Sequence, residues 1–250
     1  MGTTSLSRGL NLLECYGEKN DTFRAQDLAS RLNLPISTVY RHLDILTQHR
    51  FLHKNPLTKQ YHLGISIQRL GRLAGDESSL VQAALPFLDD LSAQSHETVF
   101  LTVLANGESV CIKKIESNRR IRLTIEEGAR QSLHAGASSR ILLAYQTDTF
   151  IKKWIETNGL PRFTPNTICS EAALLKVLKL TRKQGYTVSD SEVDAGSIAL
   201  AAPIFGTGGK LVAGLSLAGP KDRLNNEALT DLITSIVKTA GNISNELGCE

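Results

Sequence analysis

Side chains suited to reading nucleic acid are concentrated near the start of the chain, at Ser37, Thr38, Tyr40 and Arg41. Hydroxyl and phenol groups can hydrogen-bond to phosphates or base edges, and a guanidinium can make a bidentate contact with guanine O6 and N7. The alternative for Arg41 is an ion pair with Asp44, three residues further along a helix, which would contribute little. We predict that the side chains of residues 37, 38, 40 and 41 contact DNA.

Two short amphipathic helices must hold these side chains. Apolar residues recur at helical spacing, at Leu28 and Leu32 in the first helix and at Val39, Leu43 and Leu46 in the second. The proline between the two helices suits a first helical position, because it has no N–H group to leave unpaired. The pattern predicts a helix-turn-helix whose second helix enters the major groove of DNA.

A preceding helix is expected over residues 5–16, ending at Gly17. Its apolar face is predicted from four leucines: Leu6, Leu10 and Leu13 lie on one side of the helix, with Leu12 beside them.

A wing is expected after the second of the two helices. Residues 51–54 and 60–63 have the pattern of two short strands around a turn, which completes a winged helix-turn-helix. The wing would bring Lys54 or Lys59 to the phosphates, and a solvated surface hairpin explains either lysine equally well. Two arginines are also predicted to touch the DNA backbone, namely Arg8 and Arg24.

Composition sets outer bounds on the function. The chain has 250 residues, of which 41% are apolar, and this length allows one large domain or two ordinary ones. Residues 1–65 hold eight Lys and Arg against five Asp and Glu, so the whole excess of +3 lies in this front portion. The excess is too small to identify a nucleic-acid binder by itself, but its position agrees with the predicted helix-turn-helix.

Targeting and metal signals are absent from the sequence. No apolar run is long enough to cross a membrane, and the N-terminus lacks the apolar core of a secretory signal. The four cysteines are far apart and have no paired histidines nearby, which argues against a zinc site or a disulfide framework. We therefore expect a cytoplasmic protein with reduced thiols, no cofactor and no bound metal.

The rest of the chain has the pattern of a second domain. Helices are expected over residues 80–95, 138–146, 148–157, 171–184 and 226–246. Strands are expected over residues 98–104, 109–115, 120–124, 198–205 and 211–218. An Asn-Gly pair at residues 106–107 is a strong signal for a hairpin between the first two strands.

These elements predict an α+β fold in three parts. A winged helix-turn-helix would occupy residues 1–65, and a linker helix residues 66–79, interrupted at Gly75-Asp76-Glu77. Residues 80–250 would form an antiparallel sheet flanked by helices.

The order of the parts resembles the IclR-type transcriptional regulators, which combine a winged helix-turn-helix, a linker helix and a GAF-like effector-binding domain. The resemblance covers nearly the whole chain and depends on several blocks in order. These are Ser5–Leu10, Leu34–Leu43, Leu133–Ala144, Gly185-Tyr186 with Gly196, Ala201–Ile204 and Leu215–Pro220. It implies a ligand-responsive regulator of a catabolic operon, with pseudo-palindromic double-stranded operator DNA as partner and a homodimer or a dimer of dimers as the assembly.

An effector site is expected where small residues begin a helix. Ala137, Ser138 and Ser139 precede an apolar run, and the N–H groups at a helix N-terminus favour a carboxylate. The two serines serve equally well as ordinary helix caps. The resemblance adds further positions to this site: Ser189, Asp190, Ala199, Ser216 and Ala218.

Departures from the family pattern bear on the ligand. Ser189 stands where an acidic residue is common, Ala199 where Cys or Ser is common, and Ala218 where a second serine is usual, while Ser139-Arg140 replaces a Gly-Lys pair. In relatives that bind very small oxo acids such as glyoxylate or pyruvate, these polar side chains hold the ligand. Their loss would widen the pocket and make it less polar. We therefore expect a carboxylate larger than glyoxylate, with an apolar or aromatic body.

The competing interpretation is an enzyme that its N-terminal module recruits to DNA. The sequence has no phosphate-binding loop, dinucleotide-binding glycine pattern, nucleophile elbow or metal-ligand cluster to support it. Residues 206–210 superficially resemble a phosphate loop but join two expected strands, so we predict a turn. His134 has no positioned nucleophile partner and is expected to be structural. A ligand-blind DNA binder would leave residues 80–250 unexplained.

Overall fold

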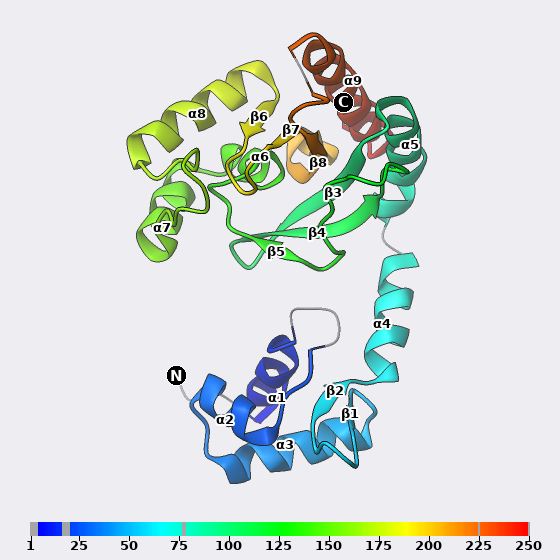
Figure 1. Cartoon of the computed structure of the whole chain (residues 1–250), viewed down its shortest axis with the longest axis vertical. Helices are drawn as coiled ribbons and strands as arrows, with labels where there is room; N and C mark the ends of the chain where they lie inside the picture. The colour runs from blue at the N-terminus through cyan, green and yellow to red at the C-terminus, as the bar shows by residue number, and fades with distance from the viewer. Residues whose placement is uncertain (1–4, 17–20, 77–78, 225, 250) are drawn as a thin grey trace. The chain divides into compact units, whose positions relative to one another are not determined.

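The computed structural model describes residues 5–16, 21–76, 79–224 and 226–249, and the chain divides into two compact units, residues 1–78 and 79–250 (Figure 1). The helix stop expected at Gly17 and the end of the interruption expected at Glu77 lie outside the described residues.

Unit 1 is a winged helix-turn-helix followed by a further helix, as the sequence predicts. Its elements are α1 (Ser5–Glu14), α2 (Ala25–Leu32), α3 (Ile36–Gln48), β1 (Leu52–Lys54), β2 (Tyr61–Leu63) and α4 (Ile65–Asp76). The two strands pair antiparallel, with Leu52 opposite Leu63. Helix α4 continues through Gly75 and Asp76, so the expected interruption is wrong at these two residues.

The break between α2 and α3 depends on one residue with a left-handed backbone. Asn33 has φ 50°, and its N–H group donates to the carbonyl of Ser30 at the end of α2. An asparagine tolerates this conformation better than most side chains. Pro35 lies one residue before α3, and its carbonyl accepts from the Thr38 and Val39 N–H groups. The proline is therefore the cap of α3 and not its first residue.

The core of unit 1 receives only part of the apolar face of α1. Leu28, Val39 and Leu43 are fully buried as expected. Leu6 and Leu10, however, are 73% and 51% exposed, whereas Leu12 is fully buried. The apolar face of α1 thus reaches the core through Leu12, with Leu13 packed against it, and not through Leu6 or Leu10. The reason is that this helix packs on α3 through its Leu12 side, and an amphipathic pattern alone does not identify which apolar side meets a neighbour.

Unit 2 is built on one antiparallel sheet of the order β5-β4-β3-β8-β7-β6. The strands are β3 (Thr98–Ala105), β4 (Glu108–Ile115), β5 (Arg130–Gln131), β6 (Thr187–Asp190), β7 (Ser197–Phe205) and β8 (Leu211–Pro220). The helices are α5 (Ser79–Ser95), α6 (Ala137–Ala144), α7 (Asp148–Asn158), α8 (Glu171–Gln184) and α9 (Asn226–Glu246). Residues 207–209 form a short turn between β7 and β8, as predicted.

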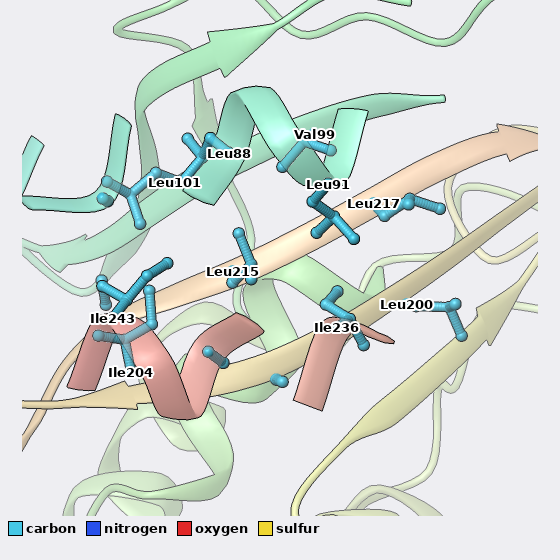
Figure 2. Packing of buried hydrophobic residues seen from close by; sticks show 14 of the residues in the cluster. Leu88, Leu91, Val99, Leu101, Leu200, Ile204, Leu215, Leu217, Ile236 and Ile243 are labelled. Atoms are coloured by element: carbon cyan, nitrogen blue, oxygen red, sulfur yellow. The ribbon is translucent and has the colours of Figure 1, made fainter. Parts of the chain in front are cut away.

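One face of this sheet carries the main core of unit 2. Successive residues of a strand point to opposite faces, so Leu215 and Leu217 of β8 share a face with Val99 of β3 and Leu200 of β7. Helices α5 and α9 cover this face, and their leucines and isoleucines interlock with those of the strands (Figure 2).

The opposite face supports α6. The Thr102 hydroxyl donates to the Ser138 carbonyl at 3.3 Å. A side chain at Gly214 would place its Cβ only 2.6 Å from Cγ2 of Ile141, so the glycine allows α6 to approach β8 closely. Helices α7 and α8 complete a second core here, which includes Trp154.

The strand expected at residues 120–124 is wrong. Residues 116–129 form an irregular segment, and the strand that pairs with β4 is β5, at residues 130–131. Side chains hold the segment: the Lys114 ammonium lies 2.7 Å from Glu116 and 3.3 Å from Glu126. The alternation of apolar and charged residues at positions 120–124 fits both a strand and an irregular segment that side chains hold, so the sequence pattern does not distinguish them.

Candidate DNA-reading face and effector pocket

Helix α3 has one buried face and one exposed face. Ser37, Tyr40 and Arg41 are exposed, and Thr38 is half-buried. Arg41 takes part in none of the ion pairs among the described residues, so the alternative pair with Asp44 does not form here. The guanidinium therefore points to solvent with its donors available for a ligand.

His42 is a buried residue of α3 that sequence reasoning missed. It is 3% exposed, and its Nε2 has no hydrogen-bond partner in the described part of the chain. Burial lowers the pKa of this imidazole, and the charges of Arg41 and Arg8 lower it further. Helical spacing does predict this burial, because His42 lies three residues after Val39 and so on the same face of the helix. Leu46, expected inside, is half-buried.

A hollow of about 460 Å³ lies between the start of α2, the helix α3 and the wing. Four residues predicted to contact DNA line it together: Arg24, Tyr40, Lys54 and Lys59. The wing turn is shaped by Asn55, whose Oδ1 accepts from the N–H groups of residues 57 and 58 at 2.9 and 3.1 Å. The Lys54 ammonium lies 5.3 Å from the centre of the Tyr61 ring, and this neighbouring side chain raises the pKa of Lys54, so the ammonium stays charged.

Arg8 lies apart from the hollow. The side chain is half-buried on α1, and its Nε has no hydrogen-bond partner among the residues that the structure describes. Its charge acts on His42, so it lies near α3.

A pocket of about 60 Å³ lies in unit 2, at the N-terminus of α6 and over the sheet face opposite the main core. Six residues predicted to bind the effector line it: Ala137, Ser138, Ser189, Ala199, Ser216 and Ala218. Gly136, one of the small residues before the predicted helix, lines it too; sequence reasoning missed the others, which are Phe100, Leu123, Thr124, Ile125, Gln131, Val193, Asp194 and Ser197.

The polar groups of this pocket are hydrogen-bond donors together with one carboxylate, that of Asp194. The Ser216 side chain is 1% exposed, lines the pocket, and has no hydrogen-bond partner for its Oγ within the described residues. Helix α6 begins at Ala137 after Gly136, whose φ of 81° favours glycine. The first N–H groups of a helix have no partner inside the helix. The arrangement therefore offers a buried hydroxyl and backbone donors to one ligand.

Two predicted effector residues do not line the pocket. Ser139 is fully buried elsewhere on α6. Asp190 pairs with Lys221 at 2.6 Å, and this ammonium, together with the Ser191 hydroxyl, lowers the pKa of the carboxyl. The alternation along β6 explains the second case, because Ser189 faces the pocket and its neighbour must face away.

His134 forms two hydrogen bonds through its ring. Nδ1 lies 2.9 Å from the Ser132 hydroxyl, and Nε2 lies 2.9 Å from the Pro161 carbonyl. Since a carbonyl only accepts, Nε2 carries the proton and Nδ1 accepts from the serine. Burial lowers the pKa of this histidine. The neutral ring thus joins two loops.

Comparisons with known proteins agree with this architecture. The IclR helix-turn-helix domain matches residues 5–56, and the bacterial transcriptional regulator IclR C-terminal domain matches residues 74–245. The chain belongs to the IclR family of bacterial transcriptional regulators. No helix in the described part of this IclR-family chain is long and apolar enough to cross a membrane.

Relatives match along nearly the whole length of the chain. The HTH-type transcriptional repressor AllR of Salmonella paratyphi A is 30% identical over 247 residues, which cover 99% of this chain and 91% of that protein. An IclR transcriptional regulator from Alicyclobacillus acidocaldarius has the same fold, with a TM-score of 0.89, 24% identity and coverage of 99% and 100%. An IclR homologue from Microbacterium hydrocarbonoxydans, solved with 4-hydroxybenzoate, has a TM-score of 0.83, 24% identity and coverage of 98% and 99%.

Proposed function

We propose that unit 1 binds a pseudo-palindromic operator of a catabolic operon and that unit 2 binds a small organic carboxylate that changes operator affinity. The observation that carries the effector half is the buried Ser216 hydroxyl, which has no protein partner among the described residues and lines a pocket at a helix N-terminus. A buried hydroxyl without a partner costs free energy, which a bound ligand would offset.

The DNA half is supported by the exposed face of α3. Arg41 is proposed to read a guanine in the major groove, with Ser37 and Thr38 at the positive end of the helix. The hollow that Lys54 and Lys59 line is proposed to receive a backbone phosphate, which carries no sequence information itself. Phosphate contact by Arg8 stays a prediction.

A two-fold dimer is proposed because one such domain buries too little surface for tight, specific binding. Apolar side chains exposed on unit 1 support it: Leu6, Leu10 and Ile45 border a groove of about 300 Å³ between α1 and α3. An exposed apolar patch of this kind is typical of a protein contact. Measuring the molecular mass of the protein in solution will show whether two dimers associate into a tetramer.

The proposed effector is a carboxylate with an apolar or aromatic body. Phe100 and the small residues Ala199 and Ala218 would contact that body, while Ser216 and the start of α6 would hold the carboxylate. The relative that binds 4-hydroxybenzoate supports the aromatic class. Because the cavity is about 60 Å³, a ring-sized acid requires the segment of residues 123–125 to move outward. Ion pairs that include the exposed side chains of Arg122 and Glu126 flank this segment, and such surface pairs are weak.

The proposed mechanism is thermodynamic linkage between the two sites. An effector that prefers one arrangement of the paired DNA-binding units changes operator affinity by its difference in affinity for the two arrangements. The proposed linker and hinge is residues 66–79, between the proposed domains 1–65 and 80–250.

The DNA half is tested by replacing Arg41 with alanine. We expect the binding free energy for operator DNA to become less favourable by about 1–3 kcal/mol, because a bidentate guanine contact is lost. The preference for guanine at the contacted base pair should become weaker for the same reason. Fluorescence anisotropy with wild-type and point-substituted operators measures both. Arg130→Ala, at an exposed arginine of unit 2, is the control. Unchanged affinity and preference in Arg41→Ala would refute the proposed reading helix.

The effector half is tested by calorimetry with 4-hydroxybenzoate, benzoate and glyoxylate. We expect the aromatic acids to bind more tightly than glyoxylate, and Ser216→Ala to weaken them by about tenfold because a hydrogen bond to a charged group is lost. Ser139→Ala is a matched control, since this buried serine also lacks a partner among the described residues but does not line the pocket. Tight binding of glyoxylate alone would refute the aromatic class.

A further inference from the structure

A buried ion pair lies beside the effector pocket. Arg140 of α6 is 1% exposed and is the largest fully buried side chain in the described residues. Its Nη1 lies 2.6 and 2.5 Å from the two carboxylate oxygens of Glu192. Its other nitrogens donate to the Thr187 hydroxyl at 3.0 Å and to the Val188 carbonyl. One guanidinium thus joins α6, the edge strand β6 and the residues that follow β6.

Glu192 is held from several directions. Its Oε2 accepts from the N–H group of Gly136, the residue that precedes α6, at 3.4 Å. Its carbonyl accepts from the Thr167 hydroxyl at 2.7 Å and from the Thr164 hydroxyl at 3.3 Å. The carboxylate and the backbone of this one residue therefore connect the start of α6 with the loop before α8.

The residues directly after Glu192 form a wall of the pocket. Val193, Asp194 and Ser197 line it, as do Gly136, Ala137 and Ser138 at the start of α6. The loop closes on itself, because the Ser191 N–H group donates to the Ser197 carbonyl at 2.7 Å. Cγ2 of Val193 lies 3.2 Å from the place a Cβ of Gly136 would occupy, so the two walls touch at this point.

We propose that the Arg140–Glu192 pair is a positioning element that holds residues 191–197 against the N-terminus of α6 and so sets the width of the effector pocket. The inference depends on the proposed effector site. Neither side chain lines the pocket, so both act through the residues they hold.

The charges also matter for an anionic ligand. Glu192 places a carboxylate at the same helix terminus that is proposed to receive the effector carboxylate. Arg140 neutralises it at close range, in an environment where an uncompensated charge would act strongly. A neutral amide at position 192 keeps the shape of the side chain but loses the charge-assisted hydrogen bonds.

The experiment compares Glu192→Gln with Glu97→Gln. Glu97 is a matched control, because it is 2% exposed and pairs with Arg223 at 2.7 Å, but it does not line the pocket. Amide hydrogen exchange of the full-length protein without ligand is measured first. We expect exchange over residues 136–138 and 191–197 to become about tenfold faster in Glu192→Gln and to stay unchanged in Glu97→Gln. Arg140→Lys, which keeps the charge with fewer donors, should give an intermediate rate.

The second measurement is binding of 4-hydroxybenzoate, benzoate and glyoxylate to the same variants. We expect Glu192→Gln to weaken the binding of 4-hydroxybenzoate by about tenfold or more and to reduce the protein's preference for this acid over glyoxylate. The reason is that residues 191–197 and the start of α6 are no longer held at one spacing. Glu97→Gln should lower thermal stability without changing this preference.

Several outcomes would overturn the proposal. Exchange that is unchanged in Glu192→Gln, or equally faster in both variants, would show that the pair has no positioning role. Faster exchange with unaltered ligand preference would show that it does not set the pocket. If the wild-type protein binds none of the three acids, the proposed effector class fails, while the exchange rates still decide whether the pair positions these residues.

Discussion

Neighbouring residues of α6 have different surroundings, and this limits what sequence alone can assign. Ser138 lines the pocket and Ser139 does not. A sequence pattern locates the start of a helix, but it does not say which of two adjacent hydroxyls faces a cavity. The Arg140–Glu192 pair was not predicted either, because its partners are 52 positions apart and only the folded chain brings them together.

His134 is predicted to make the stability of unit 2 depend on pH. Burial holds its pKa below the usual value, and the unfolded chain takes up a proton near pH 6.5. The stabilising contribution is therefore complete above about pH 6.5 and is lost as the pH falls through and below it. Denaturant titrations followed by the fluorescence of Trp154, the single tryptophan, should show the free energy of unfolding falling from about pH 7.5 to about pH 5.5.

The same titrations on His134→Gln should show a smaller fall, because the proton uptake on unfolding is removed. His53→Gln, at an exposed histidine of the wing, should leave the pH dependence of unit 2 as it is. A pH dependence that survives unaltered in His134→Gln would contradict the assignment.

At the scale of elements, the periodicity of apolar residues and the positions of turn-forming residues predicted most of the fold. The hairpin of β3 and β4, the turn at residues 206–210 and most helices were found because each has a local cause. The strand at residues 120–124 was wrong because side-chain contacts, the Arg122–Glu116 ion pair and the Lys114–Thr124 hydrogen bond, hold that segment in place of a backbone ladder. The sequence did not indicate which leucines of α1 would be buried, because packing partners distant in sequence decide it.

The contact of α6 with β8 gives a test of packing. Gly214→Ala would force its Cβ against Ile141, so we expect a loss of about 1–3 kcal/mol in the free energy of unfolding. Gly241→Ala is the opposite case, since nothing lies within 4 Å of a Cβ at this exposed position of α9. The second variant should gain up to about 1 kcal/mol through helix propensity. Denaturant unfolding measures both, and equal effects would contradict the close approach of α6.

At the scale of the whole molecule, the sequence was most informative. The order of a winged helix-turn-helix, a helix and an α+β unit indicated the IclR family, and domain matches over residues 5–56 and 74–245 confirm it. The effector could not be predicted to the same degree. The proposed pocket draws residues from several stretches that are far apart in the sequence, so no single motif encodes its shape.

Linkage between the two proposed sites makes a prediction that holds whether the ligand raises or lowers the affinity for operator DNA. If 4-hydroxybenzoate changes operator affinity by some factor, saturating operator must change 4-hydroxybenzoate affinity by the same factor, typically about 5–150-fold. Paired anisotropy and calorimetry experiments measure the two factors. Ser216→Ala should reduce the response to ligand while ligand-free operator affinity stays constant. Unequal factors at equilibrium would contradict a simple two-state coupling.

The strand β8 serves both the main core and the pocket, because its side chains alternate between the two faces of the sheet. Single substitutions made one after another along residues 215–218 should therefore produce alternating phenotypes. Changes at Leu215 and Leu217 should yield protein that accumulates poorly in cells, whereas changes at Ser216 and Ala218 should yield abundant protein with an altered ligand preference. New ligand preferences can thus be selected at Ser216 and Ala218 at little risk to folding.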